Sequence, residues 1–362
     1  MRHPPLSPAA SGLDRGELHW PEVLLTGISR NPHVPMKTRQ GPPGDPLAMR
    51  ILRAAHLGMC FGVRDAIALA LEHAEAGPVT ILGDLVHNPT VLGTLEAKGI
   101  AVAQTVADVK TPTVMVTAHG ASGKSLARTR ALGLRVVEAT CPLVHVAHRA
   151  VAALARDGYH VVIVGQRDHV EVRGLTGDLD RCDVVLEDED VLALAGHPRI
   201  GIAAQTTQPV EKVRHVVALI RERFPQSEVR FLDTVCKPTK DRQSAAVEMA
   251  RQADLVIIVG GRSSNNTREL VKTCARYCPR VHHVQTEAEI RSEWFDGVNV
   301  VGLTAGTSTP DDVIDRVERQ VRLHADASTS ARGAADESGA SNGCASEPSA
   351  QLVSTADPAC ER

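Results

Sequence analysis

Three cysteines share one sequence context, and this repeat constrains the fold more than any other feature of the chain. Apolar stretches of strand character end at Cys60, Cys141 and Cys236, and helix-forming sequence follows each cysteine. Each unit continues to a second apolar strand ending in a polar loop, at residues 117–120, 165–169 and 260–266. The repetition predicts three copies of one α/β module, each contributing one cysteine and one polar loop.

The pattern between the cysteines supports the α/β class. Short β-branched runs at residues 113–117, 160–165 and 255–261 are typical of buried parallel strands. Residues 144–157 and 208–223 carry apolar side chains at helical spacing. Aromatic residues make up only 2% of the chain, so Val, Leu, Ile and Ala must fill the core. We expect open, mainly parallel sheets covered by helices.

Composition divides the chain of 362 residues into five parts. Clustered prolines predict a flexible leader over residues 1–48, with Met49 as the functional start. The three modules are expected at 49–141, 142–235 and 236–323. The Ser-, Ala- and Gly-rich stretch 324–362 is expected to be a disordered tail.

The overall charge argues against some classes of partner. A formal net charge of -3 provides no long-range attraction for nucleic acid or an anionic membrane. No apolar run approaches the roughly 20 residues of a spanning helix, and no signal peptide is recognisable. The expected location is therefore the cytoplasm, where eight cysteines indicate metal binding, redox chemistry or burial rather than disulfides.

The repeated cysteines suit a metal cluster. Ligands of open α/β sheets gather beyond the carboxyl ends of the strands, where all three cysteines are expected. A helix that starts at each cysteine would favour the thiolate through its dipole. Three thiolates can hold a [4Fe-4S] cluster with one iron open to substrate. The alternative is simple burial, which is common for free cysteine.

The other cysteines are expected to have no catalytic role. Cys274 and Cys278 stand four residues apart on a predicted helix, a spacing that could bind a metal but more often indicates a packed face. Cys182 falls in a predicted loop without a visible partner, and Cys344 and Cys360 fall in the predicted tail.

Nine motifs in one order give the chain a family resemblance over positions 49 to 323. They are Cys60-Phe-Gly-Val63, Val86-His-Asn88, Ala118-His-Gly120, Ala139-Thr-Cys-Pro-Leu-Val144, His169-Val-Glu171, Gln205-Thr-Thr207, Asp233-Thr-Val-Cys236 with Arg242-Gln243, Ser263-Ser-Asn265, and Thr304-Ala-Gly-Thr-Ser-Thr-Pro310. Each motif alone is weak evidence, but together they are specific. The chain resembles the 4-hydroxy-3-methylbut-2-enyl diphosphate (HMBPP) reductases, the IspH/LytB family.

The resemblance implies a trefoil of three α/β modules around one central [4Fe-4S] cluster held by the three repeated cysteines. It also implies reductive removal of the allylic hydroxyl of HMBPP, which yields isopentenyl and dimethylallyl diphosphate at the end of the methylerythritol phosphate pathway. Such an enzyme takes electrons from a ferredoxin or flavodoxin. We expect a monomer or a homodimer.

The resemblance further implies two catalytic residues. Glu171 would supply the proton that turns the leaving hydroxyl into water, and Thr206 would hold or relay that proton. Read without the motif, Glu171 would be a solvated loop carboxylate and Thr206 a helix cap.

A set of polar side chains is expected to bind the diphosphate, by the same resemblance, and its histidines would donate more strongly when protonated beside an anion. This set comprises His87, His119, His169, Ser263, Ser264, Asn265 and Ser308. Hydroxyls and backbone N–H groups in loops between strands and helices can cradle phosphate oxygens. The alternative roles are ordinary ones, namely surface histidines, turns and N-caps.

Departures from the family pattern surround the ligands without removing any. Residues 56–59, before the first cysteine, read His-Leu-Gly-Met instead of a segment with Pro, Gly and an aromatic residue. Lys237-Pro-Thr239 follows the third cysteine instead of small residues, and Val170 replaces a proline before Glu171. These changes bear on the cluster potential and the loop geometry.

Three other functions fit the sequence less well. A paralogue acting as a redox or oxygen sensor is disfavoured because Glu171 and Thr206 are both present. A nucleotide-dependent enzyme would need a phosphate-binding fingerprint, which the Gly260-Gly261 pair does not make. A zinc hydrolase is disfavoured because neither His-Glu-x-x-His nor paired C-x-x-C occurs.

Overall fold

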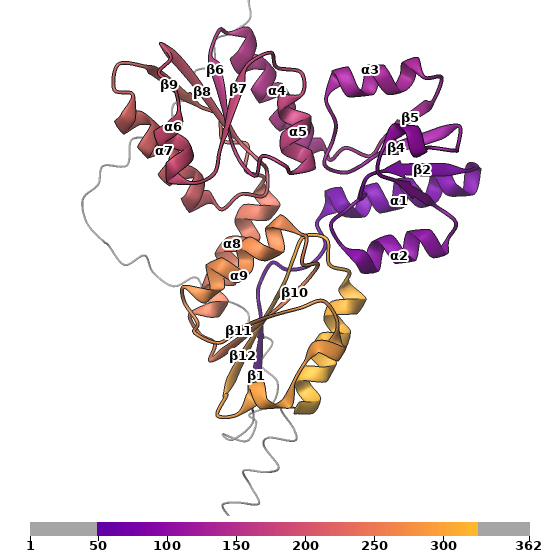
Figure 1. Cartoon of the computed structure of the whole chain (residues 1–362). Coiled ribbons are helices and arrows are strands. Elements are labelled where there is room, and N and C mark those ends of the chain that lie inside the picture. The colour runs from indigo at the N-terminus through magenta and orange to yellow at the C-terminus, as the bar shows by residue number, and fades with distance from the viewer. Residues whose placement is uncertain (1–48, 325–362) are drawn as a thin grey trace, which may run out of the picture. The chain divides into compact units, whose positions relative to one another are not determined.

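The computed structural model describes residues 49–324, which form three four-stranded sheets with parallel pairing throughout (Figure 1). Three parallel α/β modules are thus confirmed. The leader over 1–48, and the tail beyond residue 324 with Cys344 and Cys360, lie outside the described residues. Within 49–324, no helix is long and apolar enough to span a membrane.

The first sheet has the strand order β3-β2-β4-β5. Its elements are α1 (Phe61–Ala76), β2 (Val79–Leu82), α2 (Pro89–Ala97), β3 (Ala101–Ala103), η1 (Val106–Asp108), β4 (Thr113–Val116), α3 (Gly123–Ala131) and β5 (Arg135–Glu138).

The second sheet has the order β7-β6-β8-β9. Its elements are α4 (Pro142–Arg156), β6 (His160–Val164), α5 (Val170–Thr176), β7 (Cys182–Val185), α6 (Asp188–Ala193), β8 (Arg199–Ala204), α7 (Val210–Arg223) and β9 (Glu228–Phe231). Cys182 therefore begins a strand and does not lie in a loop as predicted.

The third sheet has the order β1-β12-β10-β11. Its elements are β1 (Arg50–Arg53), α8 (Lys237–Ala250), β10 (Leu255–Val259), α9 (Asn265–Ala275), β11 (Val281–Val284), η2 (Glu287–Glu289), η3 (Ser292–Phe295), β12 (Val300–Ala305) and a helix at 311–324.

The first strand of the described chain does not join the first sheet. The expected division placed residues 50–53 in a module with 79–141, but β1 pairs with β12, over the register Arg50 to Val300 and Arg53 to Leu303. In Figure 1 this strand, in indigo, lies with the orange strands of the third sheet, where it forms an edge. The repeat is therefore permuted: β1 takes the place in the third sheet that β5 and β9 take in theirs.

This permutation corrects the predicted equivalence of the loops. The loops after β6 and β10 correspond to residues 83–88, after β2, and not to residues 117–120. The loop at 117–120 follows β4 and corresponds to those after β8 and β12. Each module therefore contributes two loops, one after its β2-type strand and one after its β4-type strand.

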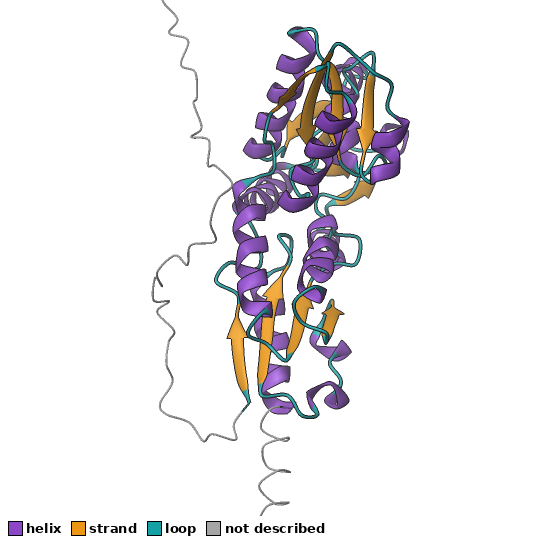
Figure 2. Cartoon of the chain, turned by 90° about the vertical axis from the view of Figure 1, so that its left-hand side faces the viewer, coloured by secondary structure: helices purple, strands orange, loops and turns teal. Residues whose placement is uncertain are grey.

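Apolar packing explains why the sheets form. β10 is buried along its whole length, and helices lie along both sides of the strands (Figure 2). The buried Ala70 of α1 and Ile81 of β2 share one core cluster. Cys274 and Cys278 are buried in the cluster between α8, α9 and the third sheet, which confirms their predicted packing role.

Candidate active site

The three repeated cysteines occupy equivalent positions at helix starts. Cys60, Cys141 and Cys236 are the N-cap residues of α1, α4 and α8. The backbone N–H of each donates to a carbonyl of a β4-type loop. The acceptors are Thr307 O for Cys60 (2.9 Å), Ala118 O for Cys141 (3.1 Å) and Thr206 O for Cys236 (3.0 Å). One backbone arrangement thus holds all three cysteines.

The thiols lie close enough to influence one another. Burial raises the pKa of the Cys141 thiol and, to about 11, that of Cys236, and the charge of Cys60 adds to both shifts. The prediction that the helix dipole favours the thiolate is wrong for Cys141 and Cys236, because burial outweighs the hydrogen bonds that lower the pKa of these two thiols. Metal binding would have to displace these protons.

The spacing of the thiols does not suit a single ion. Among residues 49–324, the sets of three potential ligand atoms within 4.8 Å of one another include no cysteine. Three sulfurs around one tetrahedral zinc at 2.3 Å would lie only about 3.8 Å apart. A cluster, in which each thiolate binds a different iron, accepts wider spacing.

A small cavity of about 40 Å³ lies where the loops of all three modules meet. Each module supplies the residue five positions after its β2-type strand: His87 after Leu82, His169 after Val164 and Ser264 after Val259. Each also supplies the residue three positions after its β4-type strand. These are His119 after Val116, Thr207 after Ala204 and Ser308 after Ala305.

The structure brings together six of the seven predicted substrate residues. His87, His119, His169, Ser264, Asn265 and Ser308 all line the small cavity. Ser263 is exposed and lines a larger, adjoining cavity instead. Sequence reasoning missed Thr207, whose hydroxyl accepts from the side chain of Asn265 at 3.0 Å. Its position three residues after a strand end was the available signal.

The small cavity also adjoins the cysteine anchors. The carbonyls of Ala118, Thr206 and Thr307 accept from the three cysteines, and the residue that follows each of them lines the cavity. A ligand in the small cavity would therefore contact residues that directly follow the three carbonyls bonded to the cysteines.

The three histidines are clustered and uncharged. Their ring centroids lie 4.3 to 5.5 Å apart. Burial lowers the pKa of all three, to about 3 for His169 and well below the usual value for His119, and neighbouring charges add to the shift of His169. His169 Nδ1 accepts from the N–H of Glu171 at 3.1 Å, so its proton resides on Nε2.

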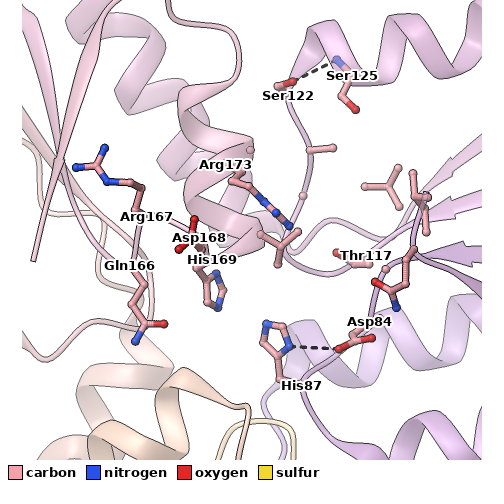
Figure 3. A pocket seen from close by; sticks show the side chains of 18 of the residues that line it. Asp84, His87, Thr117, Ser122, Ser125, Gln166, Arg167, Asp168, His169 and Arg173 are labelled. Atoms are coloured by element: carbon pink, nitrogen blue, oxygen red, sulfur yellow. Dashed lines mark hydrogen bonds and ion pairs between the residues drawn. The ribbon is translucent and has the colours of Figure 1, made fainter. Parts of the chain in front are cut away.

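Unused polar atoms face the same region. His87 Nδ1 faces Asp84 Oδ2 at 3.9 Å, beyond hydrogen-bond length (Figure 3). Within the described residues, His87 Nε2 and Asn265 Oδ1 have no hydrogen-bond partner. Buried polar atoms are normally paired, so these orphans indicate a polar ligand. Ser264 caps α9 by accepting from Thr267 N–H, as its alternative role predicted, and it lines the cavity as well.

Glu171 and Thr206 form a buried pair, as the resemblance implied. Glu171 is 1% exposed, which excludes the solvated-loop alternative. Thr206 donates to it twice, from its N–H at 2.6 Å and from its hydroxyl at 2.9 Å. Thr206 is not a helix cap, because Pro209 takes that position in α7. Burial raises the pKa of Glu171 to about 7, against the opposing effect of both hydrogen bonds.

A larger cavity of about 780 Å³ leads to the histidines from between the first and second modules. His87 and His169 line both cavities and face each other in Figure 3, where Arg173 reaches toward them. Arg268 lines the larger cavity as well, and its charge disfavours protonation of His87 and His169. Sequence reasoning missed both arginines.

A second histidine group lies at the amino ends of β6, β7 and β8. His160 Nε2 bonds Asp183 Oδ2 at 2.7 Å, and the His160 ring stacks on His197 at 3.7 Å and 7°. The nitrogen lone pairs of two stacked, parallel rings point in parallel planes and do not converge on one point. In this geometry the two histidines cannot both coordinate one ion.

Comparison with known proteins identifies relatives of this chain. The sequence model of the LytB protein family matches residues 51–322. A 4-hydroxy-3-methylbut-2-enyl diphosphate reductase of Pelobacter propionicus is 40% identical over 271 residues, covering 74% of this chain and 96% of that protein. The protein of the same name from Aquifex aeolicus is 38% identical over 278 residues, covering 75% and 96%.

Two solved structures are also similar. The structure of an (E)-4-hydroxy-3-methyl-but-2-enyl diphosphate reductase, described as the terminal enzyme of the non-mevalonate pathway, is 38% identical with a TM-score of 0.57. It covers 76% of this chain and 99% of its own. The corresponding Plasmodium falciparum reductase is 26% identical with a TM-score of 0.71, covering 75% and 87%.

Proposed function

The chain belongs to the LytB family, and from this membership and the site geometry we infer that it is an HMBPP reductase. It catalyses the last step of the non-mevalonate isoprenoid pathway. The allylic C–O bond breaks, and two electrons and two protons enter. One proton completes water with the departing hydroxyl, and the other joins the allylic carbon skeleton. It joins the carbon that lost the hydroxyl to give dimethylallyl diphosphate, or the other end of the allyl unit to give isopentenyl diphosphate.

The family depends on iron and sulfur, and the donor set of this chain fits one [4Fe-4S] cluster. Cys60, Cys141 and Cys236 would hold it from three helix N-termini, each thiolate on a different iron. When bound, such a cluster supplies single electrons and an iron that can act as a Lewis acid on the substrate hydroxyl.

The small cavity would bind the diphosphate through neutral donors. The Nε2–H of His169 and the hydroxyls of Ser264 and Ser308 line it from different modules. Arg268 and Arg173 supply the nearby positive charge from the larger cavity. Ser263, which lines that larger cavity, would contact the substrate as it enters.

The Glu171 carboxyl carries the proposal, because reductive dehydroxylation needs a proton source in a dry site. Its pKa of about 7 leaves it half protonated at neutral pH, whereas an ordinary glutamate would be ionised. Thr206 would position the carboxyl and reorient its hydroxyl when the protonation state changes.

The remaining elements of the proposal rest on the family. We place the protein in the cytoplasm as a monomer or homodimer, with a ferredoxin or flavodoxin as the electron donor. Competition between purified donors in an otherwise identical assay would identify the preferred one.

The test is anaerobic reconstitution with iron and sulfide, followed by an assay on HMBPP with a chemical reductant. We expect about four irons per chain, as a [4Fe-4S] centre requires, and turnover to both products. Cys141→Ser should lose the iron. Cys182→Ser, a matched control on β7, should keep it. Wild-type protein that binds no iron, or binds it without reducing HMBPP, would overturn the proposal.

A further inference from the structure

Arg242 is a buried cation without an anionic partner. Its side chain belongs to α8 and the residue is only 8% exposed. Among residues 49–324, no carboxylate forms an ion pair with it, and its neighbour Asp241 pairs with Lys237 at 2.7 Å. A buried charge without compensation is strongly unfavourable, so a counter-charge must be supplied by some other group.

The hydrogen bonds of Arg242 connect two of the cluster ligands. Its Nε and one terminal nitrogen donate to Gly58 O at 3.0 and 2.7 Å, and the other terminal nitrogen donates to Pro238 O at 3.1 Å. Gly58 stands two residues before Cys60, and Pro238 stands two residues after Cys236. The guanidinium therefore ties the backbones beside two thiols that lie far apart in the sequence.

The repeat shows that packing alone does not require an arginine here. Arg242 stands six residues after its cysteine, and the equivalent residues after Cys60 and Cys141 are Ala66 and Ala147. Both alanines are buried, at 1% and 0% exposure. Two modules thus fill this position with a small apolar side chain, and only the third introduces a charge.

The third module also differs three residues after its cysteine. Thr239 is fully buried and its hydroxyl lies 3.1 Å from Cys236 Sγ, where the other modules have Val63 and Val144. Polar support is therefore concentrated around one of the three thiols.

We propose that Arg242 is a positioning residue for the iron-sulfur cluster. Its positive charge offsets the charge of the cysteine thiolates, and its hydrogen bonds fix the backbone beside Cys60 and Cys236. This inference rests on the proposed function. A cation beside the cluster stabilises the reduced, more negative state, so Arg242 raises the reduction potential.

The experiment is a redox titration of the reconstituted holoenzyme, monitored by electron paramagnetic resonance. Arg242→Gln should lower the equilibrium constant for one-electron reduction at least tenfold, equivalent to about 59 mV toward negative potential. Arg242→Lys keeps the charge and should stay within threefold of the wild type, with lower iron retention during dialysis. The control Arg64→Gln removes an exposed cation of α1 and should leave the potential unchanged.

Each outcome decides the matter. An Arg242→Gln protein with full iron content and the wild-type potential overturns the proposal. If Arg242→Gln assembles no cluster but Arg242→Lys does, the result supports a role for the positive charge. If both variants fold and neither assembles a cluster, the proposal is overturned. Wild-type protein without iron would refute the proposed function itself, so the two failures are distinguishable.

Discussion

Glu171 should determine how the reaction depends on pH. Its pKa of about 7 lies above the ordinary value because of burial, so the protonated donor disappears as pH rises through 7. We expect kcat to fall about tenfold per pH unit above 7, the slope of a single titrating donor. Steady-state assays between pH 6 and 9, at saturating reductant, measure this profile.

Replacing Glu171 tests the same role directly. Glu171→Gln keeps the size of the side chain but cannot release a proton, so we expect kcat to fall by about 10² to 10⁴ with the iron content unchanged. Glu138→Gln is the control, because this carboxylate pairs with Arg130 on the first module. Near-normal turnover of Glu171→Gln would assign the proton to another group.

Arg268 should act on substrate capture and not on the chemical step. The histidines carry no charge, so the diphosphate meets its positive field in the larger cavity. We expect Arg268→Gln to raise KM about tenfold, to leave kcat unchanged and to weaken the dependence of kcat/KM on salt. Arg276→Gln, at the C-cap of α9 and paired with Glu211, is the matched control. Equal effects of both substitutions would contradict this role.

At the scale of elements, the local sequence predicted the strands and helices, but not which loops correspond between the three modules. The strands before Cys141 and Cys236, and the runs beginning at Thr113, His160 and Leu255, follow from apolar patterns that neighbouring residues determine. The prediction that a strand reaches each cysteine is wrong, because β1, β5 and β9 end seven, three and five residues before theirs. The loop at 117–120 was paired with the wrong partners, because equivalence depends on sheet order, which only long-range strand pairing establishes.

The site residues likewise divide into those that local sequence predicts and those whose roles depend on distant parts of the chain. The three cysteines were predictable because each stands between a strand and a helix. Thr207 and Arg242 were not, because their roles arise from Asn265 and Gly58, which lie 58 and 184 residues away in the chain. The raised pKa of Cys141 and Cys236 could not be predicted, because burial cannot be judged from a helix start alone.

The start of α1 should be intolerant of a side chain. A Cβ on Gly62 would collide with Cys141 Sγ, so this glycine lets α1 approach the N-cap residue of α4. We expect Gly62→Ala to lower iron retention several-fold by displacing that sulfur. Iron analysis after reconstitution and dialysis measures the effect.

Gly93→Ala provides the control for a helical glycine. Gly93 lies within α2, and an added Cβ would meet no atom within 4 Å. This change should keep full iron content and raise the free energy of unfolding by about 0.5 to 1 kcal/mol, the usual advantage of alanine in a helix. Equal iron retention in both variants would show that the Gly62 contact does not position the sulfur.

At the scale of the whole molecule, the permuted repeat makes the first cysteine depend on the end of the described chain. Gly58 N–H donates to Ala305 O and Cys60 N–H donates to Thr307 O, while β1 pairs along β12. Residues 300–307 must therefore be in place before Cys60 can be positioned. The first of the three proposed cluster cysteines is thus held by the last strand of the described residues, β12, and the loop after it.

Asn88 should transmit this dependence between the first and third modules. Its Oδ1 caps α2 by accepting from Thr90 N–H at 3.0 Å, and its buried Nδ2 donates to Ser308 O at 2.9 Å. Asn88→Ala loses the cap, at about 1 kcal/mol, and leaves the Ser308 carbonyl unsatisfied, at about 1 to 3 kcal/mol. Ser122→Ala, which removes only the cap of α3, should cost about 1 kcal/mol.

Native-state hydrogen exchange separates these two effects, because it reports where the protein opens. In Asn88→Ala we expect faster exchange both at the start of α2 and in the loop containing Ser308, together with a raised KM because that loop lines the small cavity. In Ser122→Ala the faster exchange should stay within α3. If Asn88→Ala affected α2 alone, the hydrogen bond to Ser308 would not couple the modules, and Ser308 would be held by its own loop.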